Sequence, residues 1–350
     1  MNLNKKDPIT TIYQMKNILI LFSLILFSCG SEPKNEILVS NYGYTQGTTY
    51  SIHYMSVNGA DYQITIDSIL HCVDLSLSTY LEESLISKMN RNESMKTDSL
   101  FIRVFETAMN IAGQTKGAFD PTIAPVVNFW GFGFEEIPNK DEYKLKDLMQ
   151  SVGYEKLSIQ DNILIKKNAN TQIDFNAIAQ GFTVDLVGEY LEKLGIKNYM
   201  IEIGGELKCN GLNADRELWR IGIDKPSKNV QKDRFQAIIK VNNKSVASSG
   251  NYRKYKVNNE TGLKYAHTIN PKTGSPVETN LLSVTIVSES CMRADAIATA
   301  CMVMGLEDSK IYLENHTELD GLFIYSSPKG EWLQYQTEGF KKMSIYSSTD

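Results

Sequence analysis

The order in which helix-like and strand-like segments follow one another constrains the fold more than any other feature of the sequence. Helical spacing marks 64–77 and 98–113, and short strand-like segments then alternate irregularly with helices to the end of the chain. Segments 163–167 and 171–175 predict a hairpin around an Asn-Ala-Asn turn, and further hairpins follow. This order favours an α+β fold, with mostly antiparallel or mixed sheets and flanking helices, over a doubly wound parallel sheet.

The stretch from Ile173 to Asp185, I-D-F-N-A-I-A-Q-G-F-T-V-D, predicts an extended segment that ends at Asp174 and leads into a helix. Asn176 stands where a helix N-cap would be. A strand that ends at a helix N-terminus directs free backbone N–H groups at one place, which suits an anion such as a diphosphate. Gly181 lowers helix stability, which indicates that something approaches the helix closely there. An ordinary strand–helix connection explains the same stretch.

The N-terminal segment has the pattern of a targeting signal. Residues 18–27 form an apolar run that is too short to span a bilayer as a helix, and L-F-S-C-G closes it. This pattern resembles a bacterial lipoprotein signal with Cys29 as the acceptor, and Met15 reads as a possible true start. We therefore expect a signal segment at 1–29, a polar tether at 30–43, and a protein anchored by lipid outside the cytoplasm, on the periplasmic side of the inner membrane. A plain secretory signal with a chance cysteine is the alternative.

Charge and motifs exclude several classes of function. The net charge of −5, without a dense Lys/Arg run, argues against a nucleic-acid-binding protein. Neither G-x-G-x-x-G after a strand nor G-x-x-x-x-G-K-[ST] occurs, so the two best-known nucleotide cradles are absent from the sequence. The remaining cysteines lie in apolar patterns and are expected to be buried free thiols, although an oxidising compartment would permit a disulfide. They are Cys72, Cys209, Cys291 and Cys301.

Two places carry side chains suited to chemistry. Asp295 and Thr299 are four residues apart in a predicted helix, so they share one face. A carboxylate and a hydroxyl, with a backbone carbonyl from elsewhere, form the hard oxygen set that Mg²⁺ prefers. Equally, Asp295 could serve the helix dipole and Thr299 could bond to its own helix. His267 ends a strand beside a Pro/Gly turn, where site residues are common, although a half-exposed structural histidine fits as well.

Eight stretches between Tyr44 and Gly339 together resemble the ApbE family, the FAD:protein FMN transferases. In order they are Q-G-T-T-Y, S-T-Y-L-E-E-S-L-I-S-K-M-N, G-A-F-D-P-T-I-A-P-V-V-N-F-W-G-F, I-D-F-N-A-I-A-Q-G-F-T-V-D, I-E-I-G-G-E-L, A-S-S-G-N-Y-R-K-Y, H-T-I-N-P-K-T-G-S-P and A-D-A-I-A-T. The resemblance implies a single FAD-binding catalytic domain over 44–340 and a tail at 341–350. Many members of that family are exported lipoproteins, which agrees with lipidation at Cys29.

The resemblance also implies an activity. FAD would be the substrate, with Mg²⁺ at its diphosphate. The enzyme would break the diphosphate, release AMP and attach FMN to a threonine or serine hydroxyl of an acceptor protein. The acceptors of that family are typically extracytoplasmic, flavin-carrying subunits of redox pumps.

Individual positions inherit roles from the resemblance. His267 would be the general base toward the acceptor hydroxyl. Mg²⁺ would be held by the backbone carbonyl of Ala177 and by the side chains of Asp295 and Thr299. Gln180 replaces the family's commoner Lys or Glu, which removes one charge near the phosphates. The positions implied to contact FAD are Gln46, Tyr80, Ala118, Phe119, Asp120, Asp174, Gln180 and Ile269.

Two other functions remain compatible with the sequence. A Mg²⁺-dependent FAD pyrophosphatase would use water in place of the acceptor hydroxyl and release FMN and AMP. A non-catalytic flavin-binding lipoprotein would bind FAD without releasing AMP, although it would have no need of Asp295, Thr299 and His267.

Overall fold

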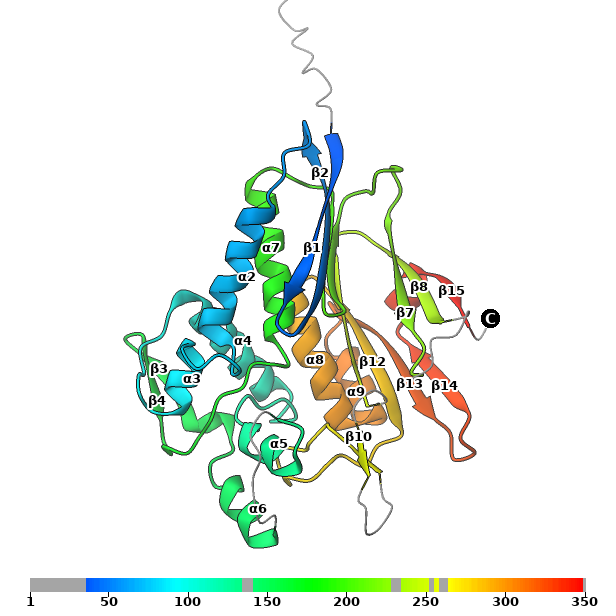
Figure 1. Ribbon diagram of the computed structural model, residues 1–350. Helices are drawn as coiled ribbons and strands as arrows, with labels where there is room; N and C mark the ends of the chain where they lie inside the picture. Colours follow the sequence, from blue (N-terminus) through cyan, green and yellow to red (C-terminus); the bar gives the residue numbers. More distant parts are fainter. Residues whose placement is uncertain (1–35, 134–140, 228–233, 252–254, 258–263, 349–350) are drawn as a thin grey trace, which may run out of the picture.

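The computed structural model describes residues 36–133, 141–227, 234–251, 255–257 and 264–348. An eight-stranded sheet, the large sheet, runs through the molecule in the order β1-β2-β5-β6-β9-β12-β13-β14 (Figure 1). Its strands are β1 (Glu36–Thr45), β2 (Thr48–Val57), β5 (Tyr199–Ile203), β6 (Glu206–Asn210), β9 (Lys244–Gly250), β12 (Leu281–Ser288), β13 (Asp320–Ser326) and β14 (Trp332–Gln336).

A three-stranded sheet, the small sheet, has the order β15-β8-β7, with β15 (Ser344–Ser347), β8 (Phe235–Val241) and β7 (Trp219–Asp224). Two separate hairpins are β3 (Leu157–Gln160) with β4 (Ile163–Lys166), and β10 (Tyr255–Val257) with β11 (Lys264–Ala266). Every pairing between these strands is antiparallel. The predicted α+β fold class is therefore confirmed.

Helices cover one face of the large sheet and the small sheet covers the other. The described helices are α2 (Gln63–Leu77), α3 (Leu85–Asn90), α4 (Ser99–Gln114), α5 (Ala124–Trp130), α6 (Glu142–Met149), η1 (Tyr154–Lys156), α7 (Ala179–Lys193), α8 (Cys291–Met304), α9 (Leu306–Glu314) and α10 (Glu338–Met343). In Figure 1, α2, α7 and α8 lie along one side of the large sheet, and β7, β8 and β15 lie on its other side.

Strand periodicity explains this sandwich. Along β5, Tyr199, Ile201 and Ile203 point toward α2 and α7 in one apolar cluster, whereas Met200 packs with the small sheet in another. Side chains of a strand alternate between its two faces, so a strand that is apolar on both faces requires a layer on each side.

Both expected domain boundaries differ from the structure. Residues 36–43, expected in a tether, belong to β1, which pairs with β2 over its whole length. Ser344–Ser347, expected in a tail, form β15, which pairs with β8, and Phe340 of α10 is fully buried. The backbone of each segment completes the edge of a sheet, and polar side chains on the outer face of an edge strand resemble those of a linker. Cys29 and the signal segment lie outside the described residues.

The predicted hairpin of 163–167 with 171–175 is wrong. Strand β4 pairs with β3, and 171–175 is an extended segment outside any sheet. The Asn90 side chain takes the place of a strand partner for Ile173: its Nδ2 donates to the Ile173 carbonyl at 2.8 Å, and its Oδ1 accepts from the Ile173 N–H at 2.7 Å. The buried backbone is satisfied in this way without a ladder.

The cysteine prediction holds for three of the four thiols. Cys209, Cys291 and Cys301 are buried and free, whereas Cys72 is free but exposed on α2. Burial raises the pKa of the Cys301 thiol to about 12, so it is chemically inert at neutral pH. Within the described part of the chain, no helix combines the length and apolarity needed to cross a membrane.

Candidate functional site

A cavity of about 890 Å³ lies at the N-terminal end of α7, beside α8 and the turn between β5 and β6. It brings together almost every position that the sequence singled out. The predicted site residues in its lining are Tyr80, Ala118, Phe119, Asp120, Asp174, Ala177, Gln180, His267, Ile269, Asp295 and Thr299. These residues come from segments separated by more than two hundred positions, and the fold brings them together around one cavity.

The lining of the cavity comes from both faces of the large sheet, and we call the two parts the helix-side lobe and the sheet-side lobe. The residues named above line the helix-side lobe, whereas Met200, Glu202, Leu207, Val246 and β7 line the sheet-side lobe. The lobes meet where β6 and β9 part. Strand β6 pairs with β9 only as far as Val246, and the rest of β9 pairs with β12 alone among the described strands.

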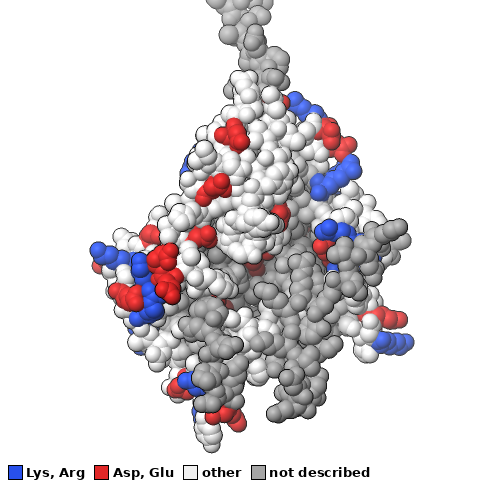
Figure 2. All heavy atoms as spheres, viewed as in Figure 1, with Lys and Arg blue, Asp and Glu red and all other residues white. Residues whose placement is uncertain are grey.

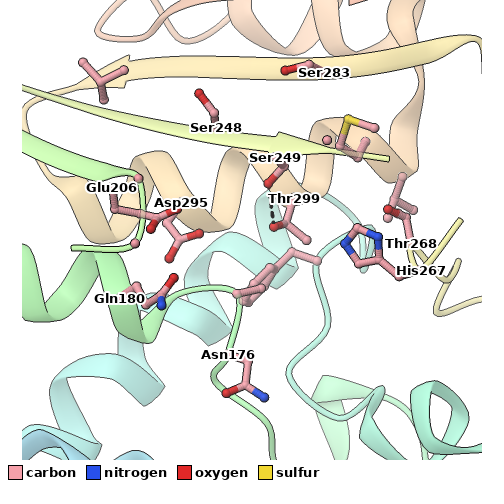
Figure 3. A pocket seen from close by; sticks show the side chains of 18 of the residues that line it. Asn176, Gln180, Glu206, Ser248, Ser249, His267, Thr268, Ser283, Asp295 and Thr299 are labelled. Carbon is pink, nitrogen blue, oxygen red and sulfur yellow. Dashed lines mark hydrogen bonds between the residues drawn. The ribbon is translucent and has the colours of Figure 1, made fainter. Parts of the chain in front are cut away.

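Asp295 and Thr299 lie one turn apart on α8 and face the helix-side lobe (Figure 3). The Asp295 carboxylate is buried, and its Oδ2 accepts one hydrogen bond from the Gly181 N–H at 3.2 Å. Desolvation raises the pKa of this carboxyl to about 7. The Thr299 hydroxyl lies 3.1 Å from Ser249 Oγ of β9, which fixes its position against the sheet.

Asp185 fixes the start of α8. Its carboxylate accepts hydrogen bonds from the Ser290 hydroxyl and from the backbone N–H groups of Cys291 and Met292, at 2.8, 3.1 and 3.0 Å. The Lys208 ammonium lies 3.2 Å away. A carboxylate at a helix N-terminus satisfies orphan donors and complements the dipole. Through these contacts α7 determines where α8 places Asp295.

Gly181 is the point at which α7 and α8 touch. A Cβ on Gly181 would lie 2.4 Å from the Cys291 carbonyl oxygen and 2.9 Å from Asp295 Cβ. The close approach predicted at this glycine is therefore that of a neighbouring helix. It allows the Gly181 N–H to reach Asp295.

The turn before α7 differs from the prediction. Ile178, not Asn176, is the N-cap, and no side chain caps the helix. Asn176 instead donates its backbone N–H to Asp174 Oδ1 at 2.7 Å. The Asp174 N–H donates to the Pro121 carbonyl at 2.8 Å, which ties this turn to the segment of Ala118 to Asp120. Burial raises the pKa of Asp174, and its hydrogen bonds to Asn176 oppose the shift.

Ala177 precedes the N-cap, so its carbonyl lies outside the helical hydrogen-bond ladder. It lines the cavity together with Asp295 and Thr299. The three residues proposed to hold Mg²⁺ thus line the same cavity. No group of three His, Cys, Asp or Glu side chains suited to a metal occurs among the described residues. The set proposed for Mg²⁺ has one such side chain, Asp295, together with a hydroxyl and a backbone carbonyl.

Asp120 is held by its own turn. Its Oδ1 accepts from the Thr122 N–H and hydroxyl, at 2.8 and 2.6 Å, and its Oδ2 accepts from the Tyr154 N–H at 3.0 Å. Burial raises its pKa, and these hydrogen bonds oppose the shift. Asp120 thus shapes the loop that presents Ala118 and Phe119 to the cavity.

His267 follows β11 and is half-buried at the far side of the helix-side lobe from Gln180 (Figure 3). Its ring meets the edge of Phe132 with the centroids 6.3 Å apart. Ile269 forms a bridge with Pro276 and is buried beneath it. Tyr80 lies at the rim with 68% of its surface exposed.

In Figure 3 the Gln180 and Asp295 side chains lie on the same side of the cavity, opposite His267, with Glu206 beside Asp295. The Gln180 amide packs against Gly204, where a Cβ would lie 2.9 Å from Nε2. Glu206, with 7% of its surface exposed, is a site residue that the sequence reasoning missed. The Gly204-Gly205 turn was its only signal: both glycines have positive φ, and the turn directs Glu206 back toward α8.

Gln46 is the predicted FAD contact that does not line the cavity. It occupies the β1–β2 turn with a φ of 51°, and its Nε2 donates to Thr183 Oγ1 of α7 at 2.7 Å. The turn holds this side chain against the second turn of α7, outside the cavity lining.

Comparison with known proteins agrees with this site. The model of the ApbE family matches residues 46–323. An FAD:protein FMN transferase of Vibrio cholerae is 37% identical, covering 93% of this chain and 98% of its own length. One of Haemophilus influenzae is 35% identical, covering 93% and 96%. The solved structure of the flavin transferase ApbE from Vibrio cholerae has a TM-score of 0.79 at 37% identity, over 88% of this chain and 99% of the other.

The apo flavinyl transferase ApbE of Pseudomonas stutzeri has a TM-score of 0.78 at 30% identity, over 88% of this chain and 97% of the other. Family model, sequence relatives and solved structures coincide over nearly the whole described chain. The chain belongs to the ApbE family.

Proposed function

We propose that this protein is a Mg²⁺-dependent FAD:protein FMN transferase that attaches FMN to a threonine or serine hydroxyl of an extracytoplasmic acceptor protein. The match to relatives of that name extends over nearly their entire length, which supports the reaction. The cavity of about 890 Å³ has the size of a small-molecule site.

The charges that line the cavity support the proposed Mg²⁺ site. Asp120, Asp174, Glu206 and Asp295 line the helix-side lobe, whereas the Lys and Arg residues in the described lining are Arg220 and Arg234, both in the sheet-side lobe. Figure 2 shows charged side chains mostly at the margins of this face, with acidic atoms inside its central hollow. A diphosphate among carboxylates requires a bound cation.

The donor set fits Mg²⁺. Asp295 is a buried carboxylate whose pKa is raised by desolvation, and a cation beside it would offset that cost. Asp295, Thr299 and the Ala177 carbonyl would hold the ion, with diphosphate oxygens and water completing the shell. When bound, the ion supplies neutralisation of the charge that develops on the diphosphate.

The chain's own groups account for the other steps. Tyr80 stacks on a ring of FAD, and the Gln180 amide donates toward the phosphates without adding charge. The acceptor oxygen forms a bond to the FMN phosphorus while the bond to the AMP phosphate breaks, and AMP departs. The His267 imidazole takes the proton of the acceptor hydroxyl. The lipid anchor at Cys29 keeps the enzyme on the periplasmic side of the inner membrane with its acceptors.

An acceptor assay tests the proposal. The protein is incubated with FAD and a purified flavin-carrying redox-pump subunit, with Mg²⁺ or with EDTA. We expect a fluorescent acceptor band and AMP with Mg²⁺, and neither with EDTA. AMP and free FMN with an unlabelled acceptor would identify a pyrophosphatase, and FAD binding without AMP would identify a flavin-binding protein.

Two variants separate the roles within the site. Asp295→Asn should abolish labelling and AMP release together. His267→Ala should still bind FAD while labelling falls at least a hundredfold. Labelling at the wild-type rate by His267→Ala would refute the base assignment.

Retention of Cys29→Ser in the membrane fraction would refute the anchor.

A further inference from the structure

The sheet-side lobe has no role in the site described so far. The residues assigned to FAD or Mg²⁺ line the helix-side lobe or, like Gln46, lie away from the cavity. The sheet-side lobe nevertheless belongs to the same cavity, because the opening between β6 and β9 joins them at the Gly204-Gly205 turn. A molecule in the sheet-side lobe can therefore reach the reacting groups beside Asp295 and Glu206.

One wall of this lobe is the open edge of a strand. Five consecutive residues of β7, from Arg220 to Asp224, line the cavity. Successive side chains of a strand point to opposite faces, so a cavity that contacts all five runs along the strand's edge. Strand β7 ends the small sheet, with β8 as its single partner among the described strands. Alternate N–H and C=O groups of β7 therefore face the cavity.

The remaining walls suit a peptide better than a second anionic ligand. Met200, Leu207 and Val246 make one side apolar. Arg220 and Arg234 lie at the other side, but each already has a carboxylate partner: Arg220 pairs with Glu217, and Arg234 donates two hydrogen bonds to Asp224. Charge on this wall is thus balanced, which leaves apolar contact and the free strand edge as the means of recognition.

The reaction itself supplies an occupant. If the chain transfers FMN to a protein, a segment of that protein must enter a cavity already occupied by FAD. An extended segment is only one strand wide, so it carries its hydroxyl deeper into the cavity than a helix or a folded loop could. Strand addition to an open edge recognises such segments through main-chain hydrogen bonds, and pockets for alternate side chains add specificity.

We propose that the segment carrying the acceptor hydroxyl binds in the sheet-side lobe as an added strand on the open edge of β7. Its threonine or serine then extends through the opening between β6 and β9 into the helix-side lobe, which His267 also lines, with the diphosphate of FAD beside it. This inference rests on the proposed transferase activity.

Cross-linking tests the placement. A cysteine at Arg220, in a Cys72→Ser background, is labelled with a benzophenone maleimide and irradiated with the flavin-carrying subunit and FAD. The matched control is a cysteine at Ile345, which is comparably exposed on β15 at the opposite edge of the same sheet. Both proteins are first checked for acceptor labelling before modification, which establishes that they fold.

We expect the Arg220→Cys adduct to cross-link to residues within a few positions of the acceptor hydroxyl. The same adduct should lower kcat/KM for the acceptor at least tenfold relative to the Ile345→Cys adduct. An Arg220→Cys adduct that labels the acceptor as fast as the control, or cross-links far from the hydroxyl, overturns the strand-addition site. Failure of the unmodified wild type to label the subunit at all would overturn the transferase activity and, with it, this site.

Discussion

Replacing Gly181 with alanine tests whether the contact of α7 with α8 holds the site together. The added Cβ would lie 2.4 Å from the Cys291 carbonyl oxygen, which is backbone and cannot rotate away. Ordinary contact needs about 3.5 Å, so the helices must separate by about 1 Å at this point. Overpacking of this kind costs up to about 3 kcal/mol, while alanine gains about 1 kcal/mol of helix propensity over glycine. We expect a net loss of about 2 kcal/mol of unfolding free energy.

Gly188 provides the matched control on the same helix. A Cβ there would lie 3.3 Å from Lys208 Cδ and 3.3 Å from Tyr199 Oη, which are atoms of side chains. The lysine can shift its flexible stem, so the propensity gain is retained and Gly188→Ala should be neutral or up to about 1 kcal/mol more stable. The two variants should therefore differ by about 2–3 kcal/mol although the chemical change is identical.

Urea unfolding followed by circular dichroism and tryptophan fluorescence measures the difference. Coincident transitions from the two signals justify a two-state free energy. Gly181→Ala should also weaken FAD binding, because separation of the helices lengthens the 3.2 Å hydrogen bond from Gly181 to Asp295. Equal stability of the two alanine variants would refute the reasoning.

Three other substitutions test separate contacts. Asp185→Asn removes the negative charge that pairs with Lys208 and leaves the largely buried ammonium without its carboxylate. It should lower the unfolding free energy by about 3 kcal/mol, measured by the same urea titration. Asp98→Ala removes the N-cap that accepts from the α4 backbone at 2.7 Å and should cost about 1 kcal/mol, with unchanged FAD affinity. Gln46→Ala removes the hydrogen bond to Thr183, so we expect about 1 kcal/mol of lost stability and, by fluorescence titration, less than a twofold change in the Kd for FAD. A large loss of FAD affinity in Gln46→Ala would show that this side chain reaches FAD after all.

Local patterns in the sequence were sufficient for elements whose partners are near in the chain. The helix predicted over 98–113 forms, with Asp98 as its N-cap, because a cap depends on a few neighbouring residues. The pairing of 163–167 was wrong for the converse reason. An apolar extended segment can join any strand, and here β3 and the Asn90 side chain compete successfully with the nearest candidate.

The site residues also divide into those that the sequence identified and those that depend on distant contacts. Motif order identified Asp295, Thr299 and His267, and these line one cavity in the structure. It could not show that Gln46 turns toward Thr183, because that outcome depends on the backbone of the β1–β2 turn. Glu206 was missed because only the separation of β6 from β9 brings its strand end to the cavity.

The sequence by itself thus determined the family, the fold class and the residue types available for chemistry, since each is encoded in short patterns and their order. Tertiary structure alone decided the distances between them. It made Gly181 the contact of two helices, gave Asp295 its burial and raised its pKa, and opened the edge of β7 to the cavity. Packing between segments far apart in the chain sets desolvation and access, and no local pattern carries that information.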